Sequence, residues 1–241
     1  MKNIVLGIIG RNISYSFSQK YFTHKFKALS LGKYSYQVFD IQEIDEVEHV
    51  FRTGNLRGFN VTIPYKEKII PYLDHLSPEA KTIGAVNTVL IKENKKWGFN
   101  TDAYGFEKTL MLHKKDFQTT AIVLGNGGAA KAIKFVLEQH QIPYETISRN
   151  SENNFLNLSA EKVKEHKIII QCTPVGTFPN VHDCVDFPFE GITEQHLIID
   201  LIYNPEQTEF MRKAKKNGAE CVNGYYMLEQ QAEKAWEIWK F

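Results

Sequence analysis

Three polar segments within the first 102 residues carry the kinds of side chain that bind and transform small molecules. Hydroxyls, carboxamides, one lysine and one aspartate suit a small, polyhydroxylated and anionic ligand, because they pair with hydroxyl groups while an ammonium attracts negative charge. Each segment by itself also fits ordinary turns and helix caps. The segments are residues 10–18, rich in serine; residues 60–66, ending in Lys66; and residues 84–88 with 98–102, ending in Asp102.

A glycine-rich turn, Gly125-Asn126-Gly127-Gly128-Ala129, follows the apolar run 120–124 and precedes a helical pattern. Glycines let the backbone approach a pyrophosphate closely, and the helix N-terminus offers it unpaired N–H groups and a positive dipole end. The next predicted strand lies about 20 residues on, which is the context that the dinucleotide-binding fingerprint requires. The spacing therefore predicts a dinucleotide site, and a glycine turn of an ordinary α/β protein is the alternative.

The end of that next strand, residues 144–148, selects the type of cofactor. A carboxylate there binds the ribose of NAD, whereas a basic side chain favours the 2′-phosphate of NADP. Arg149 occupies this position, and a guanidinium makes bidentate contacts to phosphate. The sequence favours NADP, although the nearby Glu152 and the lack of a second basic residue leave a solvated surface arginine as the alternative.

Strand and helix patterns alternate along the chain and place the polar segments at strand ends. Apolar residues at helical spacing, such as Phe22, Phe26 and Leu29, indicate helices, and short alternating or β-branched runs indicate strands. Such alternation is typical of α/β sheets covered on both faces. In the first half, strands are expected at 4–9, 34–39, 57–63, 86–91 and 97–100, and helices begin near Ser18, Ile44 and Ser77.

The second half repeats the alternation with its own strands, so we expect two α/β domains. The first comprises residues 1–102, and the second, residues 103–224, is a Rossmann-type dinucleotide-binding domain. Helices are expected at 103–113, from Gly128 to about residue 140, at 205–217 and at the C-terminus, and strands at 120–124, 144–148, 167–172, 197–201 and 220–222.

Composition and charge exclude several classes of protein. With 241 residues, a formal net charge of +1 and 43% hydrophobic residues, the chain gives no support to nucleic-acid or membrane binding. No apolar stretch approaches the roughly 18 residues that span a bilayer, and the N-terminal run is too short for a signal peptide. Cys172, Cys184 and Cys221 lack paired spacing and no histidine has ligand spacing, so we expect no metal and a reducing, cytoplasmic location.

Taken in order, these motifs resemble the shikimate dehydrogenase family over nearly the whole chain. A Rossmann glycine turn is common, but this series in the right order is specific. The motifs are the serine loop, Asn60-Val61-Thr62-x-Pro64-x-Lys66, Gly84-Ala85-Val86-Asn87-Thr88, Asn100-Thr101-Asp102-x-x-Gly105, Gly125-x-Gly127-Gly128-Ala129, Thr173-Pro174-x-Gly176, Asp200-Leu201-x-Tyr203-x-Pro205 and Gly224-Tyr225-x-Met227-Leu228-x-x-Gln231-Ala232.

The resemblance implies an NADPH-dependent enzyme that reversibly reduces 3-dehydroshikimate to shikimate, on the route to chorismate and the aromatic amino acids. It implies Lys66 and Asp102 as the catalytic pair. It also implies that the C-terminal helix, 225–241, packs back on the first domain and brings Gln231 to the substrate. We expect a small-molecule substrate, no nucleic-acid or membrane partner, and a monomer or homodimer.

The remaining site residues are also implied by the resemblance. The paired serines that hold the substrate carboxylate are Ser16 and Ser18. Side chains that bind the ring hydroxyls are Thr62, Asn87 and Gln231, and those that line the same pocket are Asn60 and Tyr203. The residues expected to contact NADP are Gly125, Asn126, Gly127, Gly128, Ala129, Ser148, Arg149, Thr173 and Gly224.

Four positions depart from the family pattern. Gln19 stands in place of proline and Ser148 in place of asparagine, while Thr177 replaces methionine and Asn223 replaces aspartate. None removes a proposed catalytic or substrate-binding group. Ser148 weakens the preference for NADP, and Thr177 alters the residues expected beside the nicotinamide.

Three other functions stay open. A quinate or dual quinate/shikimate dehydrogenase would use the same residues, since pocket differences of this size are worth only about a few kcal/mol. A folate-type methylene dehydrogenase shares the two-domain layout but gives no reason for Ser16 and Ser18. A catalytically silent shikimate or NADPH sensor should have lost Lys66 or Asp102, and the chain keeps both, which favours an enzyme.

Overall fold

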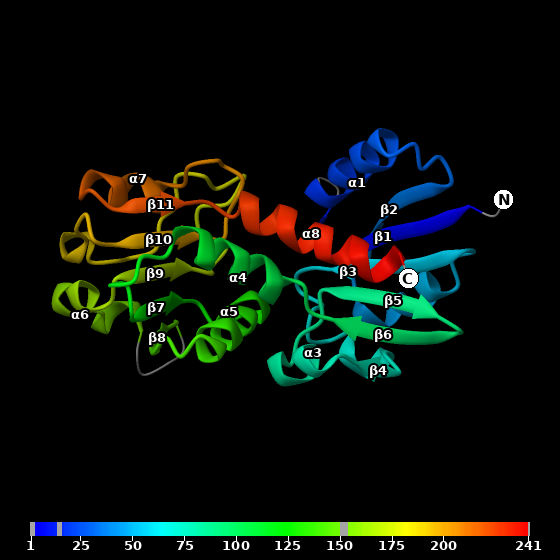
Figure 1. Ribbon diagram of the computed structural model, residues 1–241, viewed down its shortest axis with the longest axis horizontal. Helices are drawn as coiled ribbons and strands as arrows, with labels where there is room; N and C mark the ends of the chain where they lie inside the picture. The colour runs from blue at the N-terminus through cyan, green and yellow to red at the C-terminus, as the bar shows by residue number, and fades with distance from the viewer. Residues whose placement is uncertain (1–2, 14–15, 150–153, 241) are drawn as a thin grey trace. The chain divides into compact units, whose positions relative to one another are not determined.

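The computed structural model describes residues 3–13, 16–149 and 154–240. The chain forms two compact units: unit 1 is Met1–Thr101 with Ala232–Phe241, and unit 2 is Asp102–Gln231 (Figure 1). Each unit has its own β-sheet with helices packed on it, which confirms the predicted α/β class. Among the helices of the described residues, none is long and apolar enough to cross a membrane.

Six strands form the mixed sheet of unit 1: β1 (Ile4–Gly10), β2 (Tyr34–Asp40), β3 (Leu56–Val61), β4 (His75–Leu76), β5 (Thr88–Lys92) and β6 (Lys95–Phe99). Their order across the sheet is β2-β1-β3-β5-β6-β4. The strand β1 pairs in parallel with β2 and β3, whereas β5 pairs antiparallel with β3 and β6. The strands predicted at 86–91 and 97–100 are therefore present and pair as a hairpin, and the edge strand β4, which the sequence did not predict, pairs with β6.

Helices cover both faces of this sheet, as predicted, and the alternation along β1 shows how. Leu6 and Ile8 point into one apolar cluster and Val5 and Ile9 into another, because successive side chains of a strand face opposite ways. The first cluster includes side chains of α1 (Phe17–Ala28) and the C-terminal helix α8 (Tyr225–Lys240). The second includes side chains of η1 (Ile44–Glu46), α2 (Val47–Phe51), η2 (Ile70–Tyr72) and α3 (Pro78–Ile83).

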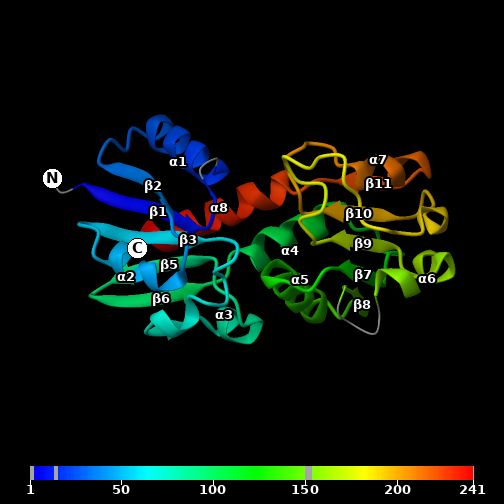
Figure 2. The same cartoon turned by 180° about the vertical axis from the view of Figure 1, so that it is seen from behind.

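The end of α8 packs on unit 1, which confirms the predicted return of the C-terminal helix (Figure 2). Trp236 and Trp239 are buried in the same cluster as Phe22 of α1. The Trp239 indole Nε1 donates to the Val89 carbonyl at 2.9 Å. A Cβ at Gly58 would lie 2.4 Å from that nitrogen, so a glycine in β3 is required for the indole to reach the sheet.

Five parallel strands form the sheet of unit 2: β7 (Ala121–Leu124), β8 (Tyr144–Ile147), β9 (Ile168–Gln171), β10 (Leu197–Asp200) and β11 (Glu220–Val222). Their order across the sheet is β11-β10-β9-β7-β8. The chain adds β8 on one side of β7 and then adds β9, β10 and β11 on the other side, so the strand order changes side between β7 and β9, as in Rossmann-type sheets. All residues of β7, β9 and β10 are buried, which is typical of a parallel sheet covered on both faces. The helices are α4 (Asp102–His113), α5 (Gly128–Gln139), α6 (Ala160–Glu165) and α7 (Glu209–Lys216), with short 3-10 turns η3 (Phe155–Asn157) and η4 (Phe189–Gly191).

The helix predicted at 205–217 was wrong at its N-terminal end, because α7 begins only at Glu209. The Thr208 hydroxyl accepts from the Met211 N–H at 3.2 Å and donates to the Asp200 carboxylate at 2.6 Å. Thr208 is therefore the N-cap, and the residues before it form a turn. The helix α6 was not predicted, and its six residues are too short to show helical periodicity.

Candidate functional site

One edge of the unit 1 sheet collects the polar segments. Parallel strands β1, β2 and β3 all end at this edge, antiparallel β5 begins there, and β6 ends there. Segments that enter or leave paired strands at one edge lie close together. The serine loop, the residues after Asn60, and Asn87 with Thr101 therefore belong to one neighbourhood of unit 1.

A chain of side-chain hydrogen bonds joins three of these segments. The Tyr36 hydroxyl donates to Asn60 Oδ1 at 2.7 Å, and Ser18 hydrogen-bonds to the same hydroxyl. Asn60 Nδ2 donates to Thr88 Oγ1 at 3.1 Å. The contact follows from strand register, because Asn60 of β3 pairs with Thr88 of β5. Two predicted substrate residues, Ser18 and Asn60, are thus brought into one network.

The third predicted member, Asn87, belongs to the same network. Asn87 Oδ1 accepts from the Thr101 N–H at 2.7 Å and from Thr88 Oγ1 at 3.2 Å, while Asn87 Nδ2 donates to Thr101 Oγ1 at 3.0 Å. All three side chains are buried. Nearby, Asn100 Nδ2 donates to the Ala85 carbonyl at 2.9 Å, which ties the two halves of this motif together.

Tyr36, Thr88 and Thr101 are the residues of this network that the site prediction missed. Tyr36 is buried, and burial raises the pKa of its phenol well above the ordinary value, so it stays a neutral hydrogen-bond donor. A signal was present in the sequence, because the alternating run 34–39 places a tyrosine on the inward face, where its hydroxyl needs a partner. The partner itself depends on strand pairing that the sequence does not show.

Lys66 lies in a turn that backbone hydrogen bonds hold from two sides. The Thr62 N–H donates to the Ile9 carbonyl at 2.9 Å, and the Tyr65 N–H donates to the Thr62 carbonyl at 2.9 Å. The Val86 N–H donates to the Lys66 carbonyl at 2.7 Å. The predicted residues Thr62 and Lys66 are therefore fixed to β1 and to the segment that carries Asn87.

Ser16 stands at the N-cap of α1 in extended backbone, yet its side chain makes no capping hydrogen bond. Ser16 is half-buried, directly before the first turn of a helix that contains Ser18. The neighbouring loop residues Ser14 and Tyr15 lie outside the described residues.

In unit 2, a predicted ligand residue follows the carboxyl end of every strand. Because the strands are parallel, these residues line one edge of the sheet, where ligands of such folds bind. The residues are Gly125 after β7, Ser148 and Arg149 after β8, Thr173 after β9, Tyr203 after β10 and Gly224 after β11.

The glycine turn meets the requirements of a phosphate cradle. Gly125 has φ +107°, a backbone conformation that favours glycine, and a Cβ there would lie 3.2 Å from Thr173 Cγ2 at the end of β9. Gly127 is the N-cap of α5 with φ −84°, makes no side-chain cap, and would offer a Cβ no neighbour within 4 Å. An uncapped N-terminus of a 12-residue helix with open space beside Gly127 fits a pyrophosphate.

Three further predicted cofactor residues differ in their surroundings. Lys134 of α5 donates to Asn126 Oδ1 at 2.6 Å, which holds the side chain of Asn126 between the two glycines of the turn. Arg149 is exposed at the end of β8. A Cβ at Gly224 would lie 2.1 Å from the Leu201 carbonyl oxygen, so only glycine fits there.

A buried carboxylate organises the loop that carries Tyr203. Asp200 accepts from the Ile202 N–H at 3.0 Å and the Thr208 hydroxyl at 2.6 Å. Burial raises its pKa from 3.8 to about 6. Tyr203 itself is 37% exposed. No role was predicted for Asp200 from the sequence, although it stands in one of the family motifs.

The remaining predicted residues are divided between the units. Lys66 belongs to unit 1, whereas Asp102, the buried first residue of α4, and Gln231 of α8 belong to unit 2. Within the described ranges, no group of histidine, cysteine, aspartate and glutamate side chains could hold a metal ion.

Known proteins share this arrangement. Residues 8–89 match the family described as shikimate dehydrogenase substrate binding domain. The NADP⁺-dependent shikimate dehydrogenases of Desulforamulus reducens and Clostridium perfringens are 34% and 37% identical to this chain, covering 99% and 98% of it and 90% and 92% of their own lengths. The crystal structure of the Thermus thermophilus shikimate 5-dehydrogenase with NADP(H) and shikimate is 32% identical, with a TM-score of 0.85 over 98% of this chain and 93% of that one. On this likeness in both sequence and fold, the chain belongs to the shikimate dehydrogenase family.

Proposed function

We propose that this chain is an NADP-dependent oxidoreductase that reversibly reduces 3-dehydroshikimate to shikimate, in the route to chorismate and the aromatic amino acids. The observation that carries the proposal is the network of Ser18, Tyr36, Asn60, Thr88 and Asn87 at one sheet edge. It gathers hydroxyl and carboxamide groups of the kind that bind a polyhydroxylated ring. The names of its relatives, which act on shikimate with NADP⁺, support the same substrate and cofactor.

Residues 1–102 with 225–241 form the substrate side in this proposal, and residues 103–224 the NADP side. Ser16 and Ser18 bind the substrate carboxylate, which agrees with a Ser16 hydroxyl that is not used to cap α1. Thr62, Asn87 and Gln231 bind ring hydroxyls, and Asn60 and Tyr203 line the pocket. A monomer or homodimer in the cytoplasm stays a prediction.

Lys66 and Asp102 are proposed to carry the chemistry of the chain. As the C3 ketone is reduced, negative charge develops on its oxygen, and the Lys66 ammonium stabilises and then protonates that oxygen. Asp102 orients the ammonium and accepts a hydrogen bond from a substrate hydroxyl. In the reverse direction, Lys66 takes the proton back from the hydroxyl of shikimate.

NADPH, when bound, supplies the hydride for the reduction. The chain holds the cofactor with the backbone of the glycine turn and the N-terminus of α5, which fit its pyrophosphate. Arg149, which is exposed at the end of β8, is proposed to pair with the 2′-phosphate of NADP. Ser148, Thr173 and Gly224 complete the proposed contacts.

The test compares shikimate with quinate and NADP⁺ with NAD⁺ in a two-by-two assay of cofactor reduction at about 340 nm, a wavelength set by the reduced nicotinamide. Turnover only with shikimate and NADP⁺ is the expected result. Equal or faster turnover with quinate or NAD⁺ would assign dual specificity. No turnover in any combination by folded protein would favour the sensor, and Lys66 and Asp102 would then need another explanation.

A further inference from the structure

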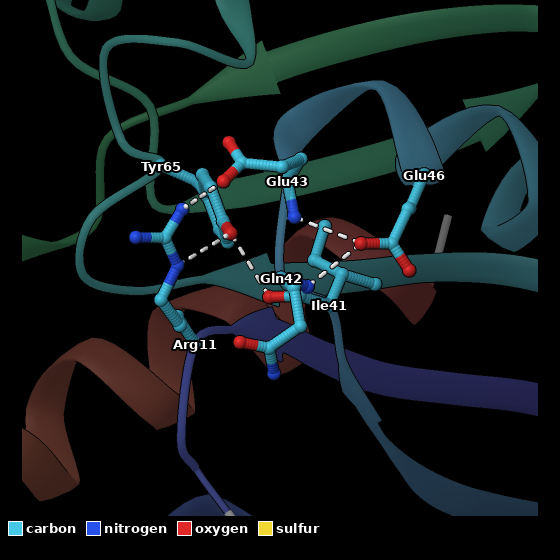
Figure 3. A network of polar contacts seen from close by, with 6 residues as sticks. All are labelled: Arg11, Ile41, Gln42, Glu43, Glu46 and Tyr65. Atoms are coloured by element: carbon cyan, nitrogen blue, oxygen red, sulfur yellow. Dashed lines mark hydrogen bonds and ion pairs between the residues drawn. The ribbon is translucent and has the colours of Figure 1, made fainter.

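A second polar network ties together loops that leave three adjacent strands of unit 1 (Figure 3). Arg11 Nε donates to the Tyr65 hydroxyl at 3.3 Å, and Arg11 Nη2 donates to Glu43 Oε1 at 3.0 Å. The Tyr65 hydroxyl donates to the Ile41 carbonyl at 2.9 Å. Arg11 follows β1, Ile41 and Glu43 follow β2, and Tyr65 follows β3. None of these four residues belongs to the proposed substrate site.

Tyr65 is the residue immediately before Lys66, and its side chain is fully buried in the apolar cluster on the α2 face. A buried hydroxyl with one donor and one acceptor partner holds a single orientation, since turning away would leave polar groups unpaired. The backbone bonds to Thr62 and Val86 fix the path of the turn. The Tyr65 side chain is therefore held in one orientation directly beside Lys66 in the chain.

The Arg11 side of the network is itself well supported. Glu43, which holds the guanidinium, lies in a loop closed by Glu46, whose Oε1 accepts from the Gln42 and Glu43 N–H groups at 2.8 Å each (Figure 3). The guanidinium carbon also lies 5.8 Å from the centre of the Tyr65 ring. Arg11 is thus held by an anion on one side and the tyrosine on the other.

The serine loop has a separate anchor. The Asp40 carboxylate accepts from the Asn12 N–H at 2.8 Å and the Ile13 N–H at 3.2 Å, and Asn12 holds a left-handed φ of 57°. These bonds do not use the Arg11 guanidinium. Removal of that group is therefore expected to disturb the lysine turn and to leave the loop of the paired serines in place.

We propose that Arg11 and Tyr65 are positioning residues for Lys66, which act on the rate of the chemical step and not on substrate affinity. The proposal rests on the proposed function, in which Lys66 meets charge that develops during reduction. A group that acts mainly in the transition state affects kcat more than KM, and small misplacements of such groups are costly.

The test is steady-state kinetics with shikimate and NADP⁺ on Tyr65→Phe, Arg11→Met and the double variant. We expect each single variant to lower kcat about tenfold and to change the KM for shikimate by less than about twofold. Because both act through one contact, the double variant should be no slower than the slower single variant. Thermal unfolding of each variant shows that it is folded.

Matched controls remove similar contacts elsewhere. Tyr144→Phe loses a hydroxyl bond to Glu138 of 2.6 Å, and Arg212→Met loses two bonds to Glu209, of 2.7 Å and 2.5 Å, all within unit 2. These two should keep the wild-type kcat within about twofold, as expected for exposed contacts. If Tyr65→Phe does not fold, Arg11→Met carries the test, since that side chain is 35% exposed.

The outcomes separate this proposal from the proposed function. Wild-type protein that does not reduce NADP⁺ with shikimate contradicts the function. If the wild type is active, three results would overturn the positioning role alone. These are an unchanged kcat in both single variants, losses that multiply in the double variant, and a rise in KM in place of a fall in kcat.

Discussion

The two units form their candidate binding surfaces from different parts of the chain. In unit 1, side chains dominate: the hydroxyls and carboxamides of Tyr36, Asn60 and Thr88 hydrogen-bond in sequence across the sheet. In unit 2, the backbone dominates: Gly125 adopts φ +107°, and Gly127 is the N-cap of α5 and makes no side-chain cap. The same sheet-edge principle thus yields a surface defined by functional groups in one unit and by conformation in the other.

This difference predicts how each surface fails. A side-chain surface loses one hydrogen-bonding group per substitution, so damage is local and falls on the ligand that the group contacts. A backbone surface is sensitive to steric and conformational requirements, which differ among its glycines. Variants that separate binding, turnover and stability therefore test the comparison.

The largest effect is expected at Lys66, the side chain to which the chemistry is assigned. Lys66→Ala should lower kcat by about 10²–10⁴-fold, the usual cost of removing a proton-transfer group, and weaken shikimate binding far less. Turnover assays with a separate measurement of the shikimate dissociation constant check both parts. Lys68→Ala, at an exposed lysine two residues on, is the control and should keep wild-type turnover. A near-normal rate for Lys66→Ala would contradict the assignment of the proton transfer to Lys66 in unit 1.

The buried carboxylate of Asp200 tests whether side chains in unit 2 contribute to the stability of the fold. Burial raises its pKa from 3.8 to about 6, so the folded state binds the proton more tightly than the unfolded state. Its contribution to stability is then fully present below pH 3.8 and is lost as pH rises through about 6. The loss amounts to about 3 kcal/mol at most, from about two pKa units at 1.36 kcal/mol each.

The measurement is the free energy of unfolding of wild type and Asp200→Asn between about pH 4 and pH 7, a range set by these pKa values. The stability of wild type relative to the variant should fall as pH rises. The comparison cancels the opposite trend from His196, whose pKa is lowered by burial and which destabilises the fold as pH falls. A constant difference across this range would show that Asp200 stays ionised in the folded protein.

Two glycines of the turn allow the requirement for a special backbone conformation to be tested separately from the requirement for open space beside the cofactor. Gly125→Ala places a side chain at φ +107° and 3.2 Å from Thr173, so we expect a loss of about 1–3 kcal/mol in unfolding free energy together with weaker NADP⁺ binding. Gly127→Ala has φ −84° and no neighbour within 4 Å, so it should keep stability within about 0.5 kcal/mol and weaken only NADP⁺ binding.

Urea unfolding and cofactor titration measure the two quantities, and shikimate binding should be unchanged in both variants. If Gly127→Ala binds NADP⁺ normally, the space beside α5 is not where the cofactor approaches. If Gly125→Ala is as stable as wild type, the left-handed turn is not required.

The same contrast explains what could be predicted from the sequence. The glycine turn, the strands other than β4 and the return of α8 follow from local patterns or from motif order, and the structure confirms the fold. Tyr36 and Thr88 were missed because their contacts depend on which residues pair across β1, β2, β3 and β5. The start of α7 was wrong for a related reason, since Thr208 is held by Asp200 from a neighbouring segment. Backbone motifs are local in sequence, whereas side-chain networks depend on long-range register.

The smallest and most specific effect is expected at Tyr36, which would show whether the unit 1 network serves the ligand. Tyr36→Phe keeps the ring but removes the hydroxyl that joins Ser18 to Asn60, at a cost of about 1 kcal/mol for one hydrogen bond. We expect a KM for shikimate raised about fivefold, with kcat and the KM for NADP⁺ unchanged. Tyr34→Phe, in the same strand and packed on Trp236, is the matched control. Equal behaviour of the two variants would reduce the network to a structural contact, and the distinction between a side-chain surface in unit 1 and a backbone surface in unit 2 would then rest on Lys66 alone.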